Sequence, residues 1–263
     1  MLTVEKITDR IIKHSVGEPR ERSNDTLKCG SESMSVSRVA VCFVASVEVV
    51  RKAIACGAEM IVTHEPTWYN ASDEFFEWME ADTVQREKRQ LIEDSGLAVW
   101  RFHDYMHAIR PDLIDVGVVE EMGWSDFRIE GSYKRFRISE QTVADVANAL
   151  KVALNATCPR LVGDPDLVVS QVAFCAGAPA SRSQIQALRD ESVELLVGGE
   201  SREWETVEYV RDAVALGQRK AYLILGHSAS EEGGMKHAAS WLRRILPEVQ
   251  VEYIESGDPF VAV

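Results

Sequence analysis

The sequence lacks a segment suited to insertion in a membrane or to secretion. Its most apolar run, residues 39–50, is far shorter than the roughly 20 residues that a membrane span requires. The first 15 residues contain no continuous apolar stretch of the kind found in signal peptides. Instead, Val4, Ile7 and Ile11 recur at helical spacing and predict an amphipathic helix. We therefore expect a cytoplasmic protein with no membrane partner.

Cysteine is scarce and has no pattern typical of disulfides or zinc sites. The five cysteines are odd in number, are scattered along the chain and form no CxxC pair. Cys42, Cys56 and Cys175 lie within apolar runs, which predicts buried free thiols in a reducing compartment.

Basic residues are in deficit, and residues that break regular structure are few. Lysine and arginine number 29 against 42 aspartates and glutamates, which gives a net charge of −13. A protein that binds duplex nucleic acid needs a basic face, so a nucleic-acid partner is not expected. A local basic pocket for a small phosphorylated substrate, or a partner protein, remains compatible with this charge. With only 8 prolines, 16 glycines and 46% hydrophobic residues, the chain can form a substantial core and is neither fibrous nor disordered.

Strand-like and helix-like patterns alternate along the chain. Before residue 130, strands are predicted at 36–45, 58–64 and 97–103, and helices at 47–57 and 82–96, the second with Asp82 as its cap. After residue 130, strands are predicted at 133–138, 160–175, 193–199, 220–226 and 249–256, and the segment 160–175 holds two strands about a Gly-Asp-Pro turn. Helices are predicted at 139–154, 181–191, 202–217 and 234–247, and Ser139 is the expected cap of the first of them. This alternation predicts an α/β fold of two lobes with mostly parallel sheets.

Histidine is also rare, yet four of the six histidines follow predicted strands. His64 ends the strand at 58–64, His103 ends the strand at 97–103, and His227 follows the strand at 220–226. In open α/β sheets, ligands bind in the crevice beyond the carboxyl ends of the strands. We therefore expect these three segments to meet at one site.

The neighbours of these histidines have the spacing of metal ligands. His107 lies four residues after His103, and Glu231 lies four residues after His227, so each pair faces one way on a helical turn. Imidazole and carboxylate groups together suit zinc, iron, manganese or cobalt. With Glu65 beside His64, six candidate ligands favour two divalent ions over one, and a closely spaced pair of ions can activate a water.

Several nearby residues have two open interpretations. Trp68, Tyr69 and Asn70 are candidates to line a substrate pocket or to pack between the lobes. Arg101 and Arg110 are candidates to bind a phosphate or carboxylate, or to form surface ion pairs. A single histidine after a strand is itself more often an ordinary hydrogen-bonded residue than a ligand, so the prediction depends on the three-way coincidence.

The same segments resemble the Ngg-interacting-factor-three-like family, whose members are also called GTP cyclohydrolase 1 type 2 homologues or dinuclear-metal hexameric proteins. The family's His-His-Pro motif after a strand is similar to IVTHEP (61–66), and its His-Thr-Asn-Leu-Asp motif to HDYMH (103–107). Its Gly-His-x-x-x-Glu motif matches GHSASE (226–231), and its Thr-Gly-Glu motif is echoed by GGE (198–200). The early Asp-Asn-x-Gly-Leu motif is only faintly echoed by NDTLKCG (24–30).

The chain departs from the family pattern at two ligand positions. Glu65 stands where the pattern has a second histidine, and His107 stands where it has an aspartate. The two exchanges preserve the number of ligands and the approximate charge of the site. Glu231 becomes the first candidate to bridge two ions and Glu65 the second, whereas Asp104 is a candidate ligand or an orienting group for His103.

The resemblance implies a domain arrangement and a ligand set. Residues 1–130 would form an N-terminal lobe with two metal motifs, and residues 131–263 a second lobe whose segment 220–263 returns the third motif to a shared cleft. The metal ligands would be His64, Glu65, His103, His107, His227 and Glu231, and they would hold two divalent ions (zinc, iron or manganese).

The resemblance also implies an activity and an assembly. The expected activity is hydrolysis of a small molecule, with a nucleotide as one candidate, by a metal-activated water; GTP cyclohydrolase-like and phosphoester chemistry are both open. Glu231, Glu65 and Asp104 are the candidate catalytic carboxylates, and Glu200 is a further candidate base or a helix cap. The resemblance implies a homohexamer. The alternative is a non-enzymatic metal-binding scaffold, a regulatory protein or a metal store.

Overall fold

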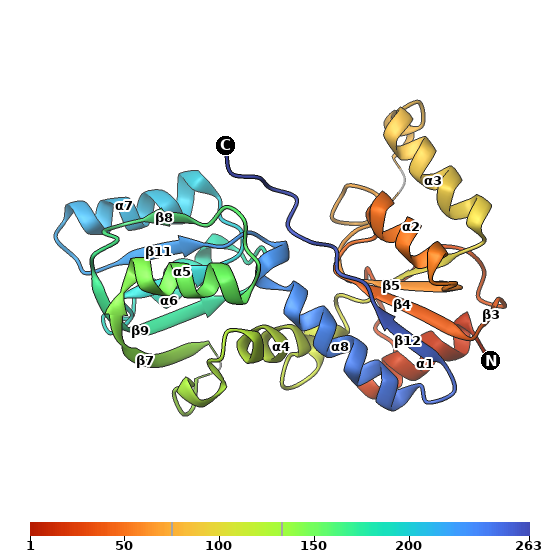
Figure 1. Ribbon diagram of the computed structural model, residues 1–263, viewed down its shortest axis with the longest axis horizontal. Coiled ribbons are helices and arrows are strands. Elements are labelled where there is room, and N and C mark those ends of the chain that lie inside the picture. Colours follow the sequence, from red (N-terminus) through yellow and green to blue (C-terminus); the bar gives the residue numbers. More distant parts are fainter. Residues whose placement is uncertain (75, 133) are drawn as a thin grey trace. The chain divides into compact units, whose positions relative to one another are not determined.

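A computed structural model describes residues 1–74, 76–132 and 134–263 and divides the chain into two compact units (Figure 1). The first unit comprises Met1–Gly117 and Gly234–Ser256, and the second comprises Val118–Gly233 and Gly257–Val263. Each unit contains a five-stranded sheet whose central strands are parallel. The predicted α/β class with mostly parallel sheets is therefore confirmed.

The sheet of the first unit has the strand order β12-β4-β5-β6-β2. These strands are β12 (Gln250–Tyr253), β4 (Arg38–Cys42), β5 (Met60–Thr63), β6 (Ala98–Arg101) and β2 (Leu27–Cys29). The first four are parallel and β2 is antiparallel to β6. Every residue of β5 and β6 is buried, because helices cover both faces of the sheet, and this explains the continuous apolar runs in the sequence. A short ribbon joins β1 (Leu2–Thr3) to β3 (Ser35–Val36).

Four helices accompany this sheet: α1 (Val4–Ser15), α2 (Val47–Ala55), α3 (Thr83–Ser95) and α8 (Glu232–Ile245). Helices α2 and α3 pack on one face, where Val50 and Ile92 join a core with Ile61, and α1 and α8 lie on the opposite face (Figure 1). The Asp82 side chain caps α3 by accepting from the backbone N–H of Gln85, as predicted for this helix start.

The sheet of the second unit has the order β7-β9-β10-β11-β8. These strands are β7 (Arg135–Thr142), β9 (Val168–Cys175), β10 (Leu195–Gly198), β11 (Ala221–Ile224) and β8 (Arg160–Val162). The three central strands are parallel, and both edge strands are antiparallel to their neighbours. Helices α6 (Ser181–Leu188) and α7 (Glu208–Ala215) pack on the sheet, with Leu188 and Val210 against Leu196 and Tyr222.

Two local predictions differ from the structure. Ser139 lies within β7, and the side chain of Thr142 instead caps α5 (Val143–Ala153), because pairing with β9 extends β7 to Thr142. Helix α4 (Leu113–Glu121) was not predicted, since its apolar residues show no helical stripe. The first residue of the predicted strand 133–138, Tyr133, lies outside the described residues.

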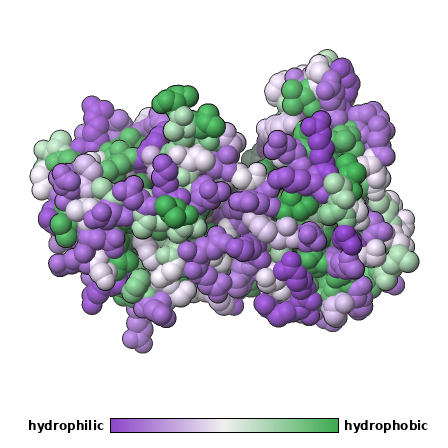
Figure 2. Space-filling view, viewed as in Figure 1, coloured by the Kyte–Doolittle hydropathy of each residue, from purple (hydrophilic) through white to green (hydrophobic). Residues whose placement is uncertain are grey.

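The chain passes from one unit to the other within α4 and α8, at residues 117/118 and 233/234, whereas the sequence suggested a change near residue 130. The segment that returns to the first unit is Gly234–Ser256, so His227 and Glu231 belong to the second unit. Hydrophilic residues cover most of the faces seen in Figure 2, as expected for a chain with 27% charged residues. Among the described residues, no helix has both the length and the apolarity to cross a bilayer.

Candidate metal centre

Two neighbouring parallel strands of the first unit bring two histidines together. Strands β5 and β6 are in register from Met60 to Thr63, so they end at the same edge of the sheet. The backbone N–H of Phe102 donates to the carbonyl of Thr63 at 2.8 Å, which carries the pairing past the end of β6. As a result, the ring centroids of His64 and His103, which follow these strands, lie 4.7 Å apart.

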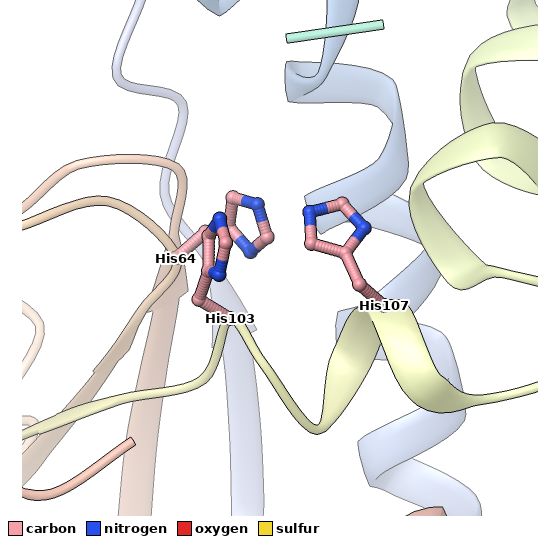
Figure 3. Close-up of side chains that lie close together, drawn as sticks. All are labelled: His64, His103 and His107. Atoms are coloured by element: carbon pink, nitrogen blue, oxygen red, sulfur yellow. The ribbon is translucent and has the colours of Figure 1, made fainter. Parts of the chain in front are cut away.

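A tight turn after β6 adds the third histidine. The N–H of His107 donates to the carbonyl of His103 at 3.0 Å, and His107 lies in the short 3-10 helix η2 (Met106–Ala108). Its ring centroid is 4.7 Å from that of His103 and 5.0 Å from that of His64. One nitrogen of each ring lies within 4.8 Å of the other two, and Figure 3 shows the three rings gathered around a common point.

Each of the three rings is oriented through its Nδ1 atom. His64 Nδ1 lies 3.0 Å from the carbonyl oxygen of Phe102, His103 Nδ1 lies 3.0 Å from Asp104 Oδ1, and His107 Nδ1 lies 2.9 Å from Asp112 Oδ2. Carbonyl and ionised carboxylate oxygens only accept, so each Nδ1 carries the proton and the lone pair of a neutral ring is on Nε2. Metal-ligating histidines typically have this arrangement.

The two orienting aspartates have stabilised charges. Burial acts to raise the pKa of Asp104, but hydrogen bonds from the N–H of Asn24, the ring of His103 and the hydroxyl of Ser23 outweigh it, and the pKa is lowered. Burial likewise opposes the ionisation of Asp112, and the bonds from His107 and the backbone lower its pKa overall. Since both oxygens of Asp104 accept hydrogen bonds, the geometry favours an orienting role over direct metal ligation.

The environment of His103 keeps its imidazole neutral. Burial, together with the nearby ring of His64, lowers the pKa of His103 to about 4, against the opposing effect of the hydrogen bond to Asp104. Glu65 also acts to raise this pKa, and one of its carboxylate oxygens lies within 4.8 Å of a ring nitrogen of His64. Three imidazoles beside a carboxylate form a donor set that fits a divalent transition metal.

Asp25 supports this turn, and its role was not anticipated from the sequence. Its Oδ1 accepts from the N–H groups of His103 and Asp104 at 2.8 and 2.9 Å, and its Oδ2 accepts from the N–H of Tyr105 at 2.8 Å. The residue is buried, and burial raises the pKa of its carboxyl group despite the three N–H donors. The only signal in the sequence was its place in NDTLKCG (24–30), which faintly echoes a family motif.

One arginine near the cluster is buried in the fold, and two others line a cavity beside the histidines. Arg101 is buried and donates through Nε to the carbonyl of His64 and through a terminal nitrogen to the carbonyl of Ala71, so it braces the loop after β5. A cavity of about 290 Å³ adjoins the cluster. It is lined by Arg20, His103, Asp104, His107, Ala108 and Arg110.

The aromatic residues that follow His64 differ in their burial. Trp68 is buried in the core cluster of the first unit, and its backbone N–H donates to Asp73 Oδ1 at 2.7 Å, so its side chain packs inside this unit. Tyr69 is exposed, and the ammonium group of Lys88 lies 5.0 Å from its ring centroid.

The second unit holds a histidine–carboxylate cluster at its own strand ends. Glu200 follows β10, and His227 follows the parallel neighbour β11. Nδ1 of His227 lies 2.9 Å from Glu200 Oε2, and its Nε2 lies 3.1 Å from Glu231 Oε2. Glu231 is buried, whereas the Glu200 side chain is 60% exposed. His227 and Glu231 thus form a pair able to clamp one ion, with Glu200 on the other ring nitrogen.

A glycine makes room for Glu231. Gly177, just after β9, has a φ of +65°, and a Cβ atom at this position would overlap the carboxylate of Glu231. Its N–H donates to the hydroxyl of Ser230 at 2.9 Å, and that hydroxyl donates to the carbonyl of His227 at 2.8 Å. The strand-end loops of the second unit are therefore tied together around the pair.

The fold and the two clusters define a class: an α/β protein with histidine-rich strand ends suited to divalent metal ions. The sequence model of the Duf34/NIF3 family (NGG1p interacting factor 3) matches residues 3–259, so the chain belongs to this family. The resemblance inferred from the sequence motifs is confirmed.

Comparisons with individual proteins agree with this family. The chain is 22% identical over 250 residues to the GTP cyclohydrolase 1 type 2 homolog of Clostridium perfringens (strain 13 / Type A), covering 90% of both chains. A crystal structure of a Staphylococcus aureus hypothetical protein is similar with a TM-score of 0.77 and 16% identity over 100% of both chains. A Bacillus cereus protein related to NIF3 has a TM-score of 0.77 and 14% identity over 99% of both chains. At these identities, the structural similarity shows a shared fold.

Proposed function

We propose that this protein is a metal-dependent hydrolase of a small molecule. The observation that carries the proposal is the convergence of His64, His103 and His107, each with Nδ1 held by an oxygen acceptor and Nε2 as the lone-pair nitrogen. Glu65 completes the proposed ligand set of the first unit, and His227 with Glu231 forms that of the second.

The chain's own residues have distinct tasks in this proposal. A bound divalent ion (zinc, iron or manganese) supplies Lewis acidity and an activated water. Asp104 and Asp112 hold the rings of His103 and His107 in orientation. Glu65 and Glu231 are the carboxylates able both to ligate and to accept a proton, and Glu200 is a further acceptor next to His227. We assign the catalytic transfer of protons to the carboxylates of Glu65, Glu231 and Asp104 as part of this proposal.

Two substrate classes fit this chemistry. The Clostridium perfringens relative is called a GTP cyclohydrolase 1 type 2 homolog, which supports a nucleotide as one candidate substrate. Phosphoester hydrolysis uses the same donor set. A cytoplasmic homohexamer belongs to the proposal as well, and light scattering of the purified protein tests the number of subunits.

Metal analysis of purified variants tests the ligand assignment. Wild-type protein reconstituted with zinc or manganese should retain up to two ions per chain. His103→Ala and His107→Ala should lose one ion, and His227→Ala and Glu231→Ala should lose the other. His14→Ala, which changes an exposed histidine of α1 far along the chain from every motif, is the matched control and should keep full content. Wild-type protein that binds no metal after reconstitution would exclude the central idea.

A substrate screen then separates the enzyme from the alternative of a metal-binding scaffold or store. Turnover of a nucleotide or phosphoester that depends on added metal and is lost in His103→Ala supports the hydrolase. Stoichiometric metal without turnover of any substrate class supports storage. Magnetic coupling between two manganese ions, measured by electron paramagnetic resonance, tests the implied dinuclear centre.

A further inference from the structure

We propose that the cavity beside His103 and His107 is an oxyanion-binding subsite, in which Arg20 and Arg110 bind the phosphate group of a small molecule. Its role in catalysis rests on the proposed function, but binding of the anion does not require a metal. All residues that line this cavity of about 290 Å³ belong to the first unit.

Arg20 is fixed against the turn that carries His103. Its backbone N–H donates to the hydroxyl of Tyr105 at 3.0 Å, and one terminal nitrogen donates to the carbonyl of Asp104 at 3.3 Å. The guanidinium carbon also lies 5.8 Å from the centroid of the Tyr105 ring. These contacts hold the guanidinium at the wall of the cavity.

Arg110 is fixed in the same way against the turn that carries His107. One terminal nitrogen donates to the carbonyls of His107 and Ile109, at 2.6 and 2.8 Å. An arginine has five N–H donors, and in both arginines the described bonds use only this one terminal nitrogen of the guanidinium. The remaining donors are available for a ligand.

As far as the structure describes the chain, neither arginine of the cavity forms an ion pair that would compete with a bound anion. Acidic residues outnumber basic ones by 42 to 29, and arginines such as Arg89, Arg160 and Arg211 pair with glutamates. Within the described part of the chain, neither Arg20 nor Arg110 forms an ion pair with a carboxylate. Asp104, which also lines the cavity, already accepts hydrogen bonds from Ser23, Asn24 and His103. The carboxylate of the cavity wall is thus engaged by other donors, which leaves both guanidinium groups for a bound anion.

The chemistry of the cavity selects an oxyanion of phosphate type. Planar guanidinium groups match the oxygens of phosphate through paired N–H donors. A phosphate held by both arginines would lie against the same cavity wall as the rings of His103 and His107. The subsite would therefore position an anionic substrate beside the nitrogens that the proposed function assigns to a metal ion.

Calorimetric titration of the metal-free protein with inorganic phosphate tests this subsite. Wild type should bind phosphate in a salt-dependent manner. Arg20→Ala and Arg110→Ala should each weaken binding about tenfold, the size expected for a lost charge-assisted hydrogen bond. Arg20→Lys and Arg110→Lys should recover only part of this loss, because a point charge replaces a planar fork. Arg22→Ala is the matched control, since Arg22 is an exposed arginine two residues from Arg20 that does not line the cavity.

The outcomes distinguish this inference from the proposed function. Arginine-dependent phosphate binding in a protein that takes up no metal would support the subsite and contradict the hydrolase. Undetectable phosphate binding by wild type, or equal binding by the alanine variants and Arg22→Ala, would overturn the subsite even if the metal analysis succeeds. Acetate titrated in parallel identifies the chemistry: binding as tight as that of phosphate would contradict the assignment to a phosphate group.

Discussion

The two units place ligand-type residues at equivalent strand ends but use different donors. In the first unit, three imidazoles converge, and oxygens of Phe102, Asp104 and Asp112 orient them. In the second unit, one imidazole lies between two carboxylates, Glu200 and Glu231. A nitrogen-rich set favours zinc, iron or cobalt, whereas an oxygen-rich set favours manganese or magnesium. Similar sheets in the two units therefore present donor atoms of different metal preference.

The largest expected effect is the loss of the carboxylate under the His103 turn. Asp25→Asn replaces an acceptor of three backbone N–H groups by a side chain with one acceptor oxygen, and we expect the free energy of unfolding to fall by about 3 kcal/mol. The variant should also lose metal from the first unit. Denaturant unfolding and metal analysis measure the two effects.

A carboxylate of the second unit provides the control for Asp25. Glu194 Oε2 accepts from the N–H groups of Ser170 and Gln171, but Glu194 precedes β10, whereas Glu200 of the second cluster follows this strand. Glu194→Gln should reduce stability and leave the metal content unchanged. Equal metal content in Asp25→Asn and Glu194→Gln would show that Asp25 has no special role at the site.

Removing the charge of an orienting carboxylate should weaken metal binding more in the first unit than in the second. Asp104→Asn should weaken metal binding by the first cluster about 10- to 100-fold, as expected when a group that orients a ligand is altered. Glu200→Gln should have a smaller effect on the second cluster, because the Glu200 side chain is 60% exposed and solvent screens its interaction with His227. Competition with a chelator measures both affinities. A larger effect of Glu200→Gln would reverse the comparison.

A buried lysine behind the first cluster should give a pH signature. Lys88 donates to the carbonyl of Thr67 at 2.8 Å, and burial lowers its pKa to about 8. The folded state therefore binds this proton less tightly than the unfolded state, and stability should rise with pH. We expect wild type to gain about 2 kcal/mol relative to Lys88→Met between about pH 7 and about pH 10. Parallel stability curves for the two proteins would show that Lys88 keeps an ordinary pKa.

The smallest expected effects concern hydroxyl groups that brace the strand ends. The Ser230 hydroxyl links Gly177 to His227 in the second unit, and the Thr63 hydroxyl links Phe43 to Ala45 in the first. Ser230→Ala and Thr63→Val should each reduce the free energy of unfolding by about 1 kcal/mol. Thermal unfolding measures both. A change several times larger in one variant would indicate that its unit depends far more on this brace.

Local patterns were sufficient to predict most of the fold. The buried strands were visible as short apolar runs, and the α3 start was visible from Asp82, because these features depend on neighbours in sequence. Helix α4 was not visible, since its apolar residues form no stripe on one side and its burial depends on tertiary packing. The extension of β7 past Ser139 depends on pairing with β9, which no local pattern reveals.

The candidate site was predicted in part for the same reason. His64, His103 and His107 were found because strand ends and a four-residue spacing are local signals, and the structure brings all three together. Asp25 and Asp112 were missed, because their hydrogen bonds follow no sequence pattern. Asp25 accepts from the N–H of His103, 78 residues away, and Asp112 accepts from the ring of His107. Arg20 was missed for the same reason. Arg101 was a candidate for anion binding or for a surface ion pair, but it donates to backbone carbonyls inside the fold.

Two glycines of the second unit limit which sequences can carry its cluster. A Cβ at Gly177 would overlap Glu231, and a Cβ at Gly199 would overlap the hydroxyl of Ser230 and the backbone oxygen of Gly177. In a library of all single substitutions, both positions should therefore be depleted of every other amino acid, alanine included. Such intolerance at two uncharged positions would locate the cluster from mutational data alone, without any knowledge of its chemistry.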